Sequence, residues 1–124
     1  GVQTCALPIY PDRWPTPVPR LDLVRAGHLD FEAPDPDVFR CLALAYEALR
    51  AGGSLPVVMN AANEVAVQRF LDGRLGFHGI ADVIAQTMHA YTGGAATSLD
   101  EIRAVDAWAT AAATACARKV ESVL

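Results

Sequence analysis

The sequence predicts a mainly α-helical fold, in which a small four-helix bundle is preceded by an extended, proline-rich arm with one short strand. Seven of the eight prolines precede residue 37, and proline both fixes φ and removes a hydrogen-bond donor. From residue 38 onward apolar residues recur at helical spacing, and glycine pairs at 52–53 and 93–94 interrupt that pattern. Four amphipathic segments joined by short turns are typical of a helical bundle.

The arm is expected to lack helix. Residues 10–20 carry closely spaced prolines, so we expect an extended or polyproline-like backbone. Residues Leu29 to Glu32 alternate apolar and polar side chains, as a short strand does. The sequence offers this strand no evident neighbour, and an unpaired strand leaves its backbone groups without partners. We therefore expect the partner strand to lie in missing sequence or in another subunit.

The first helix of the bundle is predicted to begin at Asp35 and to end before the glycine pair at 52–53. Asp35 followed by Pro36 is a capping residue followed by a first-turn proline. The side chains expected to face the core are Val38, Cys41, Leu42, Ala45 and Leu49.

The second helix is predicted from Pro56 or Asn60 to Leu71, with Gly73 after its end. Asn60 can turn its side-chain oxygen onto the free backbone N–H groups of a first turn. Glu64 then places negative charge near the positive end of the helix dipole. The expected core residues of this helix are Val65, Phe70 and Leu71.

The third and fourth helices are predicted from residues 79 to 91 and from residue 98 onward. The third has the apolar face Ile80, Val83, Ile84, Thr87, Met88 and Tyr91. Ser98 followed three residues later by Glu101 is a capping box. The apolar face of the fourth helix is Ile102, Val105, Ala109, Ala112, Cys116 and Val120. Its alanines allow close approach to neighbouring helices, and Arg118 and Lys119 lie near the negative end of its dipole.

Length and charge limit the class of protein. A chain of 124 residues suits one domain, or a small domain with an arm. The net charge of −4 argues against nucleic-acid and membrane-surface partners, which need clustered Lys and Arg. We find neither an apolar run of about eighteen residues, which a spanning helix needs, nor a signal-peptide pattern. Cys5, Cys41 and Cys116 form no C-x-x-C motif, so we expect free thiols in a cytoplasmic protein.

The histidines and carboxylates of the sequence are its candidate metal ligands. His28, His78 and His89 form no H-x-x-x-H or H-E-x-x-H motif. His78 and Asp82 are one helical turn apart, but two ligands do not make a site. We therefore expect surface or capping roles for the histidines.

An acidic cluster near the arm consists of Glu32, Asp35 and Asp37. A metal site needs oxygens that converge from several places, whereas helix capping explains Asp35 or Asp37 more simply. Capping is the preferred interpretation.

Two further polar segments are candidate sites. Asn60, Asn63 and Glu64 either bind an anion at a helix N-terminus, or cap the helix and fix its docking against a neighbouring domain. The second interpretation is favoured, because buried amides commonly serve backbone hydrogen bonding. The segment from Tyr10 to Trp14 either lies over a ligand as a loop or uses Arg13 in a surface ion pair. We find no nucleotide-binding glycine loop and no G-x-S-x-G motif.

Five short segments together carry a family resemblance. They are Tyr10–Arg13, Leu21–Leu23, Leu29–Asp35, Cys41–Ala45 and Asn60–Glu64. In order and spacing they resemble the C-terminal third of 1-deoxy-D-xylulose 5-phosphate reductoisomerases. The resemblance runs from residue 10 to about residue 86 and continues more weakly to the C-terminus, where Val105 and Asp106 also match. Each segment alone is weak evidence for the family, but the combination of all five in this order is specific to it.

The resemblance implies an NADPH-dependent oxidoreductase and isomerase of the non-mevalonate isoprenoid pathway. Such an enzyme converts deoxyxylulose phosphate to 2-C-methyl-D-erythritol 4-phosphate with Mg²⁺ or Mn²⁺, and it is typically a homodimer. Its NADPH-binding domain and its catalytic domain, which holds the metal carboxylates, would precede this part. The chain would then hold no catalytic, cofactor-binding or metal-binding residue and would be inactive alone. Only Pro11 resembles part of a loop that lines the substrate pocket, where we expect it to be a packing contact.

The expected division of the chain has three parts. Residues 1–9 fit the family poorly and resemble a translated adapter sequence, so we expect a foreign lead. Residues 10–34 would end the catalytic domain and form the linker, and residues 35–124 would form a C-terminal bundle that supports the catalytic domain. The alternative is a free-standing helical interaction module. In a fragment, residues 10–34 should be mobile and protease-sensitive, whereas a complete module should order them against the bundle.

Overall fold

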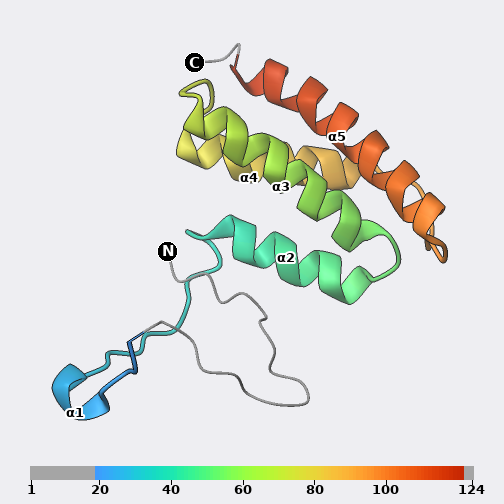
Figure 1. Cartoon of the computed structure of the whole chain (residues 1–124). Coiled ribbons are helices and arrows are strands. Elements are labelled where there is room, and N and C mark those ends of the chain that lie inside the picture. The colour runs from blue at the N-terminus through green and yellow to red at the C-terminus, as the bar shows by residue number, and fades with distance from the viewer. Residues whose placement is uncertain (1–18, 122–124) are drawn as a thin grey trace. The chain divides into compact units, whose positions relative to one another are not determined.

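The computed structural model describes residues 19–121, and the contacts divide the chain into two units, residues 1–33 and 34–124. The described part of the first unit contains one short helix, α1 (Leu23–Ala26; Figure 1). The carboxylate of Asp22 caps it by accepting the backbone N–H of Val24 at 3.0 Å and of Arg25 at 3.1 Å. Gly27, with a φ of 68°, ends it. We did not predict this helix, although both of its caps are visible in the sequence.

The predicted strand at Leu29–Glu32 is not confirmed, because these residues have no regular secondary structure. A strand needs a hydrogen-bonded neighbour, and residues 19–121 contain no strand that could provide one. Leu29 and Phe31 are instead 63% and 89% exposed. The extended arm predicted for residues 10–20 lies almost entirely outside the described residues and stays a prediction.

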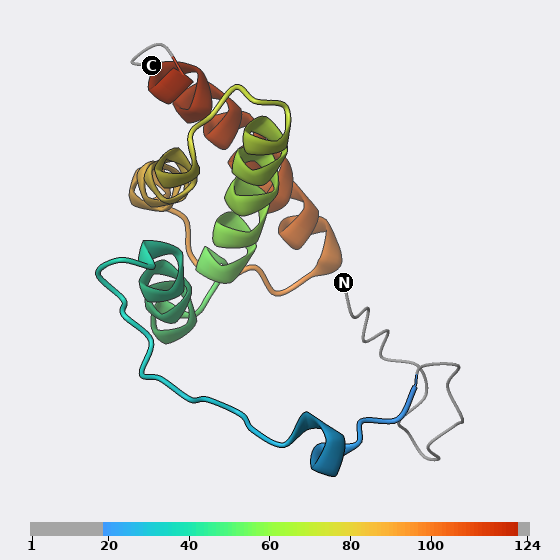
Figure 2. The same cartoon turned by 90° about the vertical axis from the view of Figure 1, so that its left-hand side faces the viewer.

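The second unit is the predicted four-helix bundle. Its helices are α2 (Arg40–Ala51), α3 (Leu55–Leu71), α4 (Phe77–Ala90) and α5 (Leu99–Glu121). Helices α3 and α4 each contact the other three helices of the bundle, whereas α2 and α5 do not contact each other. Figures 1 and 2 show α2 and α5 on different sides of the central pair. The mainly helical fold class is therefore confirmed.

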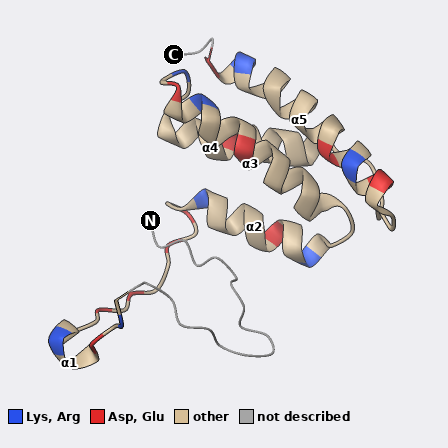
Figure 3. Cartoon of the chain, viewed as in Figure 1, with Lys and Arg blue, Asp and Glu red and all other residues tan. Residues whose placement is uncertain are grey.

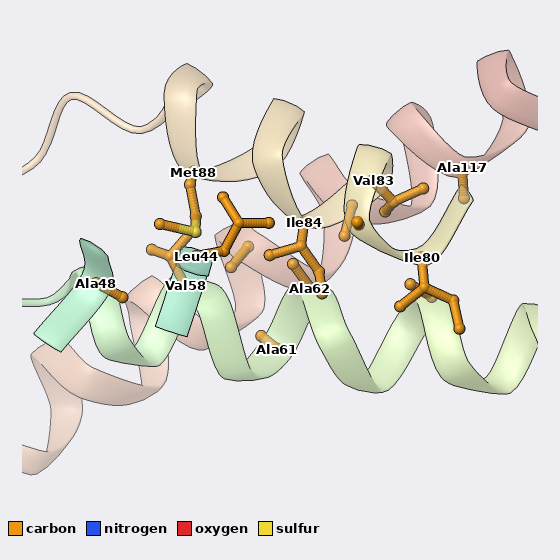
Figure 4. Close-up of a cluster of buried hydrophobic side chains, with 14 of the residues drawn as sticks. Leu44, Ala48, Val58, Ala61, Ala62, Ile80, Val83, Ile84, Met88 and Ala117 are labelled. Atoms are coloured by element: carbon orange, nitrogen blue, oxygen red, sulfur yellow. The ribbon is translucent and has the colours of Figure 1, made fainter. Parts of the chain in front are cut away.

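Branched and small side chains together fill the core between these helices (Figure 4). Val58, Val83 and Ile84 are completely buried. Helix α5 contributes only methyl groups at its deepest positions, Ala109, Ala113 and Ala117, all with no exposed surface. A methyl side chain at every fourth position lets two helix backbones approach closely. The predicted close approach through small alanines is thus confirmed. The predicted face itself needs a correction, because only Ala109 of its residues is completely buried and Ile102 is 38% exposed.

The predictions for the first bundle helix need two corrections. Asp35 does cap, since its carboxylate accepts the backbone N–H of Asp37 at 2.9 Å and of Val38 at 3.1 Å. It caps a turn, however, and α2 begins only at Arg40. Among the predicted core residues, Val38 is 62% and Leu49 is 70% exposed, whereas the buried positions of α2 are Leu44 and Ala48. The other three predicted residues, Cys41, Leu42 and Ala45, are partly buried on the same face as Leu44 and Ala48, so the prediction is wrong only at its two ends.

Helix α3 begins at Leu55, with Pro56 in its first turn, where the missing N–H of proline costs nothing. The prediction that Asn60 caps this helix is therefore wrong, because Asn60 lies inside it. Of the three predicted core residues, Val65 is partly buried, while Phe70 and Leu71 are 38% and 70% exposed.

Helix α4 begins two residues before the predicted Gly79. Its predicted apolar face is confirmed, since the buried residues include Ile80, Val83, Ile84, Thr87 and Met88.

Candidate functional site

The Asn60–Glu64 segment, the most distinctive motif of the sequence, lies in the second turn of α3 and beyond. The amide of Asn60 donates from Nδ2 to Oε1 of Glu64 at 3.1 Å, one turn further along the same helix. Between them, Ala61 and Ala62 are 2% and 0% exposed. The alanines of the motif therefore make the helix contacts, and its outer polar pair makes an i,i+4 hydrogen bond.

A shallow groove of about 420 Å³ lies between α3 and α5 beside this motif. Its lining is Ala61, Glu64, Val65, Gln68, Arg69, Thr110 and Thr114. The polar side chains are already engaged within the protein: Gln68 donates to Asp72 at 2.9 Å, and Thr114 donates to the carbonyl of Thr110 at 2.8 Å. A ligand would have to displace these bonds, so the groove is a poor binding site.

Charged residues join the end of α5 to α3 and to the loop that follows α3. Arg69 donates to Oε1 of Glu121 at 2.7 Å, and Arg74 donates to Oε2 at 3.1 Å. The Arg69 and Glu121 side chains are only 14% and 15% exposed. The hydrogen bond from Arg69 is the main reason why the pKa of Glu121 is below its ordinary value, against an opposing effect of desolvation. We call these three residues the Glu121 latch, and nothing local in the sequence predicted it.

A second contact between residues far apart in the sequence joins the turns at residues 52–53 and 93–94. Ser54 is 2% exposed and donates its hydroxyl to the carbonyl of Gly94 at 2.7 Å. Nearby, the rings of Tyr91 and Trp108 have centroids 5.1 Å apart. We had interpreted the glycine pairs only as helix ends, whereas the structure also brings their turns together around a space of about 310 Å³.

The capping box at the start of α5 is confirmed. Glu101 accepts the backbone N–H groups of Thr97 at 2.7 Å and Ser98 at 3.1 Å, and its own N–H donates to the hydroxyl of Ser98 at 3.3 Å. These bonds lower the pKa of Glu101, with the backbone bond from Thr97 as the largest cause.

The structure does not assemble the candidate metal ligands. Asp82 accepts a hydrogen bond from Arg40 at 2.7 Å, while His78 is exposed and lies edge-on to the ring of Phe77. His28 contacts Asp30 at 2.9 Å, with both side chains 82% exposed. Residues 19–121 contain no group of three His, Cys, Asp or Glu side chains that could hold a metal ion. The donor set of the described residues therefore does not fit a divalent cation.

The remaining surface shows no concentration of one charge. Figure 3 shows acidic and basic residues interspersed along the helices. None of the helices in the described part of the chain is long and apolar enough to cross a membrane. Cys41 and Cys116 are half-buried free thiols. Cys5, Pro11 and the Tyr10–Trp14 segment lie outside the described residues, so the interpretations placed on them stay predictions.

The polar side chains of the described residues mostly bond to other parts of the protein. Their buried polar side chains all have hydrogen-bond partners. The one histidine–carboxylate contact among them, between His28 and Asp30, is open to solvent. Several of the specific interactions in residues 34–121 join helices or loops that are far apart in the sequence, as Arg69 with Glu121 and Ser54 with Gly94 do.

Comparison with known proteins gives one consistent result. Residues 4–112 match the family model described as the DXP reductoisomerase C-terminal domain. Curated relatives named 1-deoxy-D-xylulose 5-phosphate reductoisomerase include the proteins of Chlorobium phaeobacteroides (51% identical, covering 81% of this chain and 26% of the relative) and Heliobacterium modesticaldum (47% identical, covering 92% and 30%). This chain thus spans less than a third of the length of these relatives.

Two solved structures agree with that assignment. The reductoisomerase of Zymomonas mobilis in complex with NADPH matches with a TM-score of 0.78 and 42% identity, over 87% of this chain and 29% of that one. A structure described as DOX-P reductoisomerase with fosmidomycin and magnesium matches with a TM-score of 0.72 and 34% identity, over 91% of this chain and 30% of that one. The chain belongs to the family of the C-terminal domain of 1-deoxy-D-xylulose 5-phosphate reductoisomerase.

Proposed function

We propose that this chain is the C-terminal part of a working 1-deoxy-D-xylulose 5-phosphate reductoisomerase. The whole enzyme would convert deoxyxylulose phosphate to 2-C-methyl-D-erythritol 4-phosphate with NADPH, in the non-mevalonate route to isoprenoids. The observation that carries the proposal is the family match over residues 4–112, together with about 50% identity to relatives of that name.

The role of this part would be structural. Its helices bury alanine-lined faces, and its ionic groups mostly hold helices together, as the Glu121 latch does. We assign NADPH and Mg²⁺ or Mn²⁺ to the missing domains. The descriptions of the two solved relatives, one with NADPH and one with magnesium, support this assignment for the whole enzyme. The chain alone would bind neither group and would not turn over substrate.

The proposal includes the organisation expected from the sequence. Residues 10–34 would end the catalytic domain and form the linker, and residues 35–124 would form the bundle. Pro11 would pack beside the substrate pocket. The enzyme would be a cytoplasmic homodimer whose bundle supports the catalytic domain, with no nucleic-acid or membrane partner.

A replacement experiment tests this function. The Zymomonas mobilis enzyme is shortened by the part that matches this chain, and residues 10–124 of this chain are joined in its place. We call this protein the joined enzyme. Substrate-dependent NADPH oxidation should be lost in the shortened enzyme and recovered in the joined enzyme. An unrelated four-helix bundle joined at the same point should not restore it, and equal recovery with that bundle would contradict the proposal.

A further inference from the structure

One end of the bundle has a cluster of large apolar side chains on its surface. Val38, Phe39, Phe70 and Phe77 are 62%, 57%, 38% and 63% exposed. We call these four residues the phenylalanine patch. They come from the segment that leads into α2, the end of α3 and the start of α4. In Figure 1 these segments lie together at the end of the bundle where the chain enters α2.

The members of the patch touch or share one surface. The rings of Phe70 and Phe77 meet edge to face, with centroids 5.9 Å apart. Phe39 and Phe77 both line a notch between the beginnings of α2 and α4, with a volume of about 90 Å³. Scattered exposed apolar residues need no explanation, but a contiguous group marks an interaction site.

The chemistry of the rim indicates an apolar partner. Two side chains with polar groups, Arg40 and His78, also line the notch. Arg40 is already paired with Asp82 at 2.7 Å. The notch is smaller than a cavity of about 150 Å³ that holds benzene, so it suits a single aliphatic side chain.

We propose that the phenylalanine patch docks the bundle onto the catalytic part that precedes it in the whole enzyme, with one aliphatic side chain of that part in the notch. The inference rests on the proposed function. The relatives that this chain matches are more than three times its length, and their C-terminal domain is the part matched here, so the upstream part of the enzyme is the occupant we infer.

The course of the backbone favours this patch over the other exposed apolar residues. The chain enters the bundle through Val38 and Phe39 themselves, where Asp35 fixes it by accepting the backbone N–H of Val38 at 3.1 Å and, through its carbonyl, that of Phe39 at 2.9 Å. The linker that joins the catalytic part to the bundle thus ends beside the patch, and such a connection raises the effective concentration of the catalytic part there. Leu99, which is 60% exposed at the start of α5, lies sixty residues further along the chain.

Thiol labelling tests the docking. Phe39→Cys and Phe77→Cys are made separately in the 124-residue chain and in the joined enzyme, and Leu99→Cys serves as the matched control. Labelling rates of the new thiols are read by peptide mass spectrometry, which separates them from the native cysteines. In the joined enzyme the first two rates should fall by on the order of tenfold, as expected for a site that reacts only on local opening. The Leu99→Cys rate should be unchanged.

Three results would overturn the proposal. The first is equal labelling of the Phe39→Cys and Phe77→Cys variants in both contexts. The second is protection of Leu99→Cys to the same degree, since docking would then not be specific to the patch. The third is slow labelling in the isolated chain that becomes fast on dilution, since the occupant would then be a second copy. Activity of the unsubstituted joined enzyme is measured in parallel, so that failure of the proposed function can be told from failure of the docking.

Discussion

Arg69 donates a hydrogen bond to Glu121 at 2.7 Å across 52 residues of sequence, and neither side chain is more than 15% exposed. The contact joins the end of α3 to the end of α5. Through Arg74, the same carboxylate also holds the loop that follows α3. The last helix is thus held by charge at its C-terminus, by buried alanines in its middle and by a capping box at its start.

Replacing Glu121 by Gln should lower the urea midpoint for unfolding of the chain. The amide keeps the size of the side chain but loses the charge that strengthens both bonds from arginine. Glu47→Gln, at an exposed position of α2, is the matched control and should leave the midpoint unchanged. Equal midpoints for wild type and Glu121→Gln would show that the latch adds nothing measurable.

The stability of the chain should also depend on pH through the carboxylates of Glu121 and Glu101. The pKa values of Glu121 and Glu101 are lowered by folding from the ordinary value of 4.5. A lowered pKa means that the folded state binds fewer protons than the unfolded state near that pH. The contribution is therefore complete above 4.5 and is lost as the pH falls through the folded values. Unfolding midpoints measured from about pH 6 down to about pH 3 should fall, and less steeply for Glu121→Gln. An identical slope in that variant would contradict the assignment.

The capping box predicts a specific response at Ser98. Ser98→Ala removes the hydroxyl that accepts the backbone N–H of Glu101, and loss of such a cap costs about 1 kcal/mol of unfolding free energy. Ser98→Thr keeps the hydroxyl and should cost much less. Urea denaturation of the three proteins checks the prediction, which fails if threonine is as damaging as alanine.

The buried alanines of α5 should not tolerate replacement by larger side chains. Ala113 has no exposed surface, so Ala113→Leu should push α5 from its neighbours and cost about 1–3 kcal/mol or more. Ala115, two residues away, is exposed, and Ala115→Leu makes the same chemical change without overpacking. Thermal unfolding of both variants compares them. If the two substitutions cost the same, the close packing of α5 is not what the structure indicates.

Much of the bundle could be predicted because its helices carry clear local signals. The apolar residues of α4 recur at helical spacing, and Ser98 with Glu101 forms a capping box at the start of α5. Both helices can therefore be predicted from the sequence. Apolar spacing alone does not say where along the chain the buried face of a helix begins and ends. For this reason the spacing predicts Val38 and Leu49 in the core although both are exposed.

Other features depend on information that no local window contains. Asn60 has the side chain of a good cap, but the helix already begins at Leu55 because Pro56 suits a first turn. The contacts of Glu121 with Arg69 and of Ser54 with Gly94 join residues 52 and 40 positions apart. Such pairs exist only once the helices have packed. The same holds for function. The family resemblance can be found from short motifs in the sequence, whereas the Glu121 latch and the phenylalanine patch cannot, because their residues come together only in the folded bundle.

The most direct test of the central claim is the rate of substrate-dependent NADPH oxidation by the purified 124-residue chain, with deoxyxylulose phosphate and Mg²⁺ or Mn²⁺ present. We expect no rate above that of the assay without protein, because we propose that this part of the enzyme is structural. Oxidation that grows in proportion to the concentration of the chain would contradict it, since these helices would then hold a catalytic site of their own.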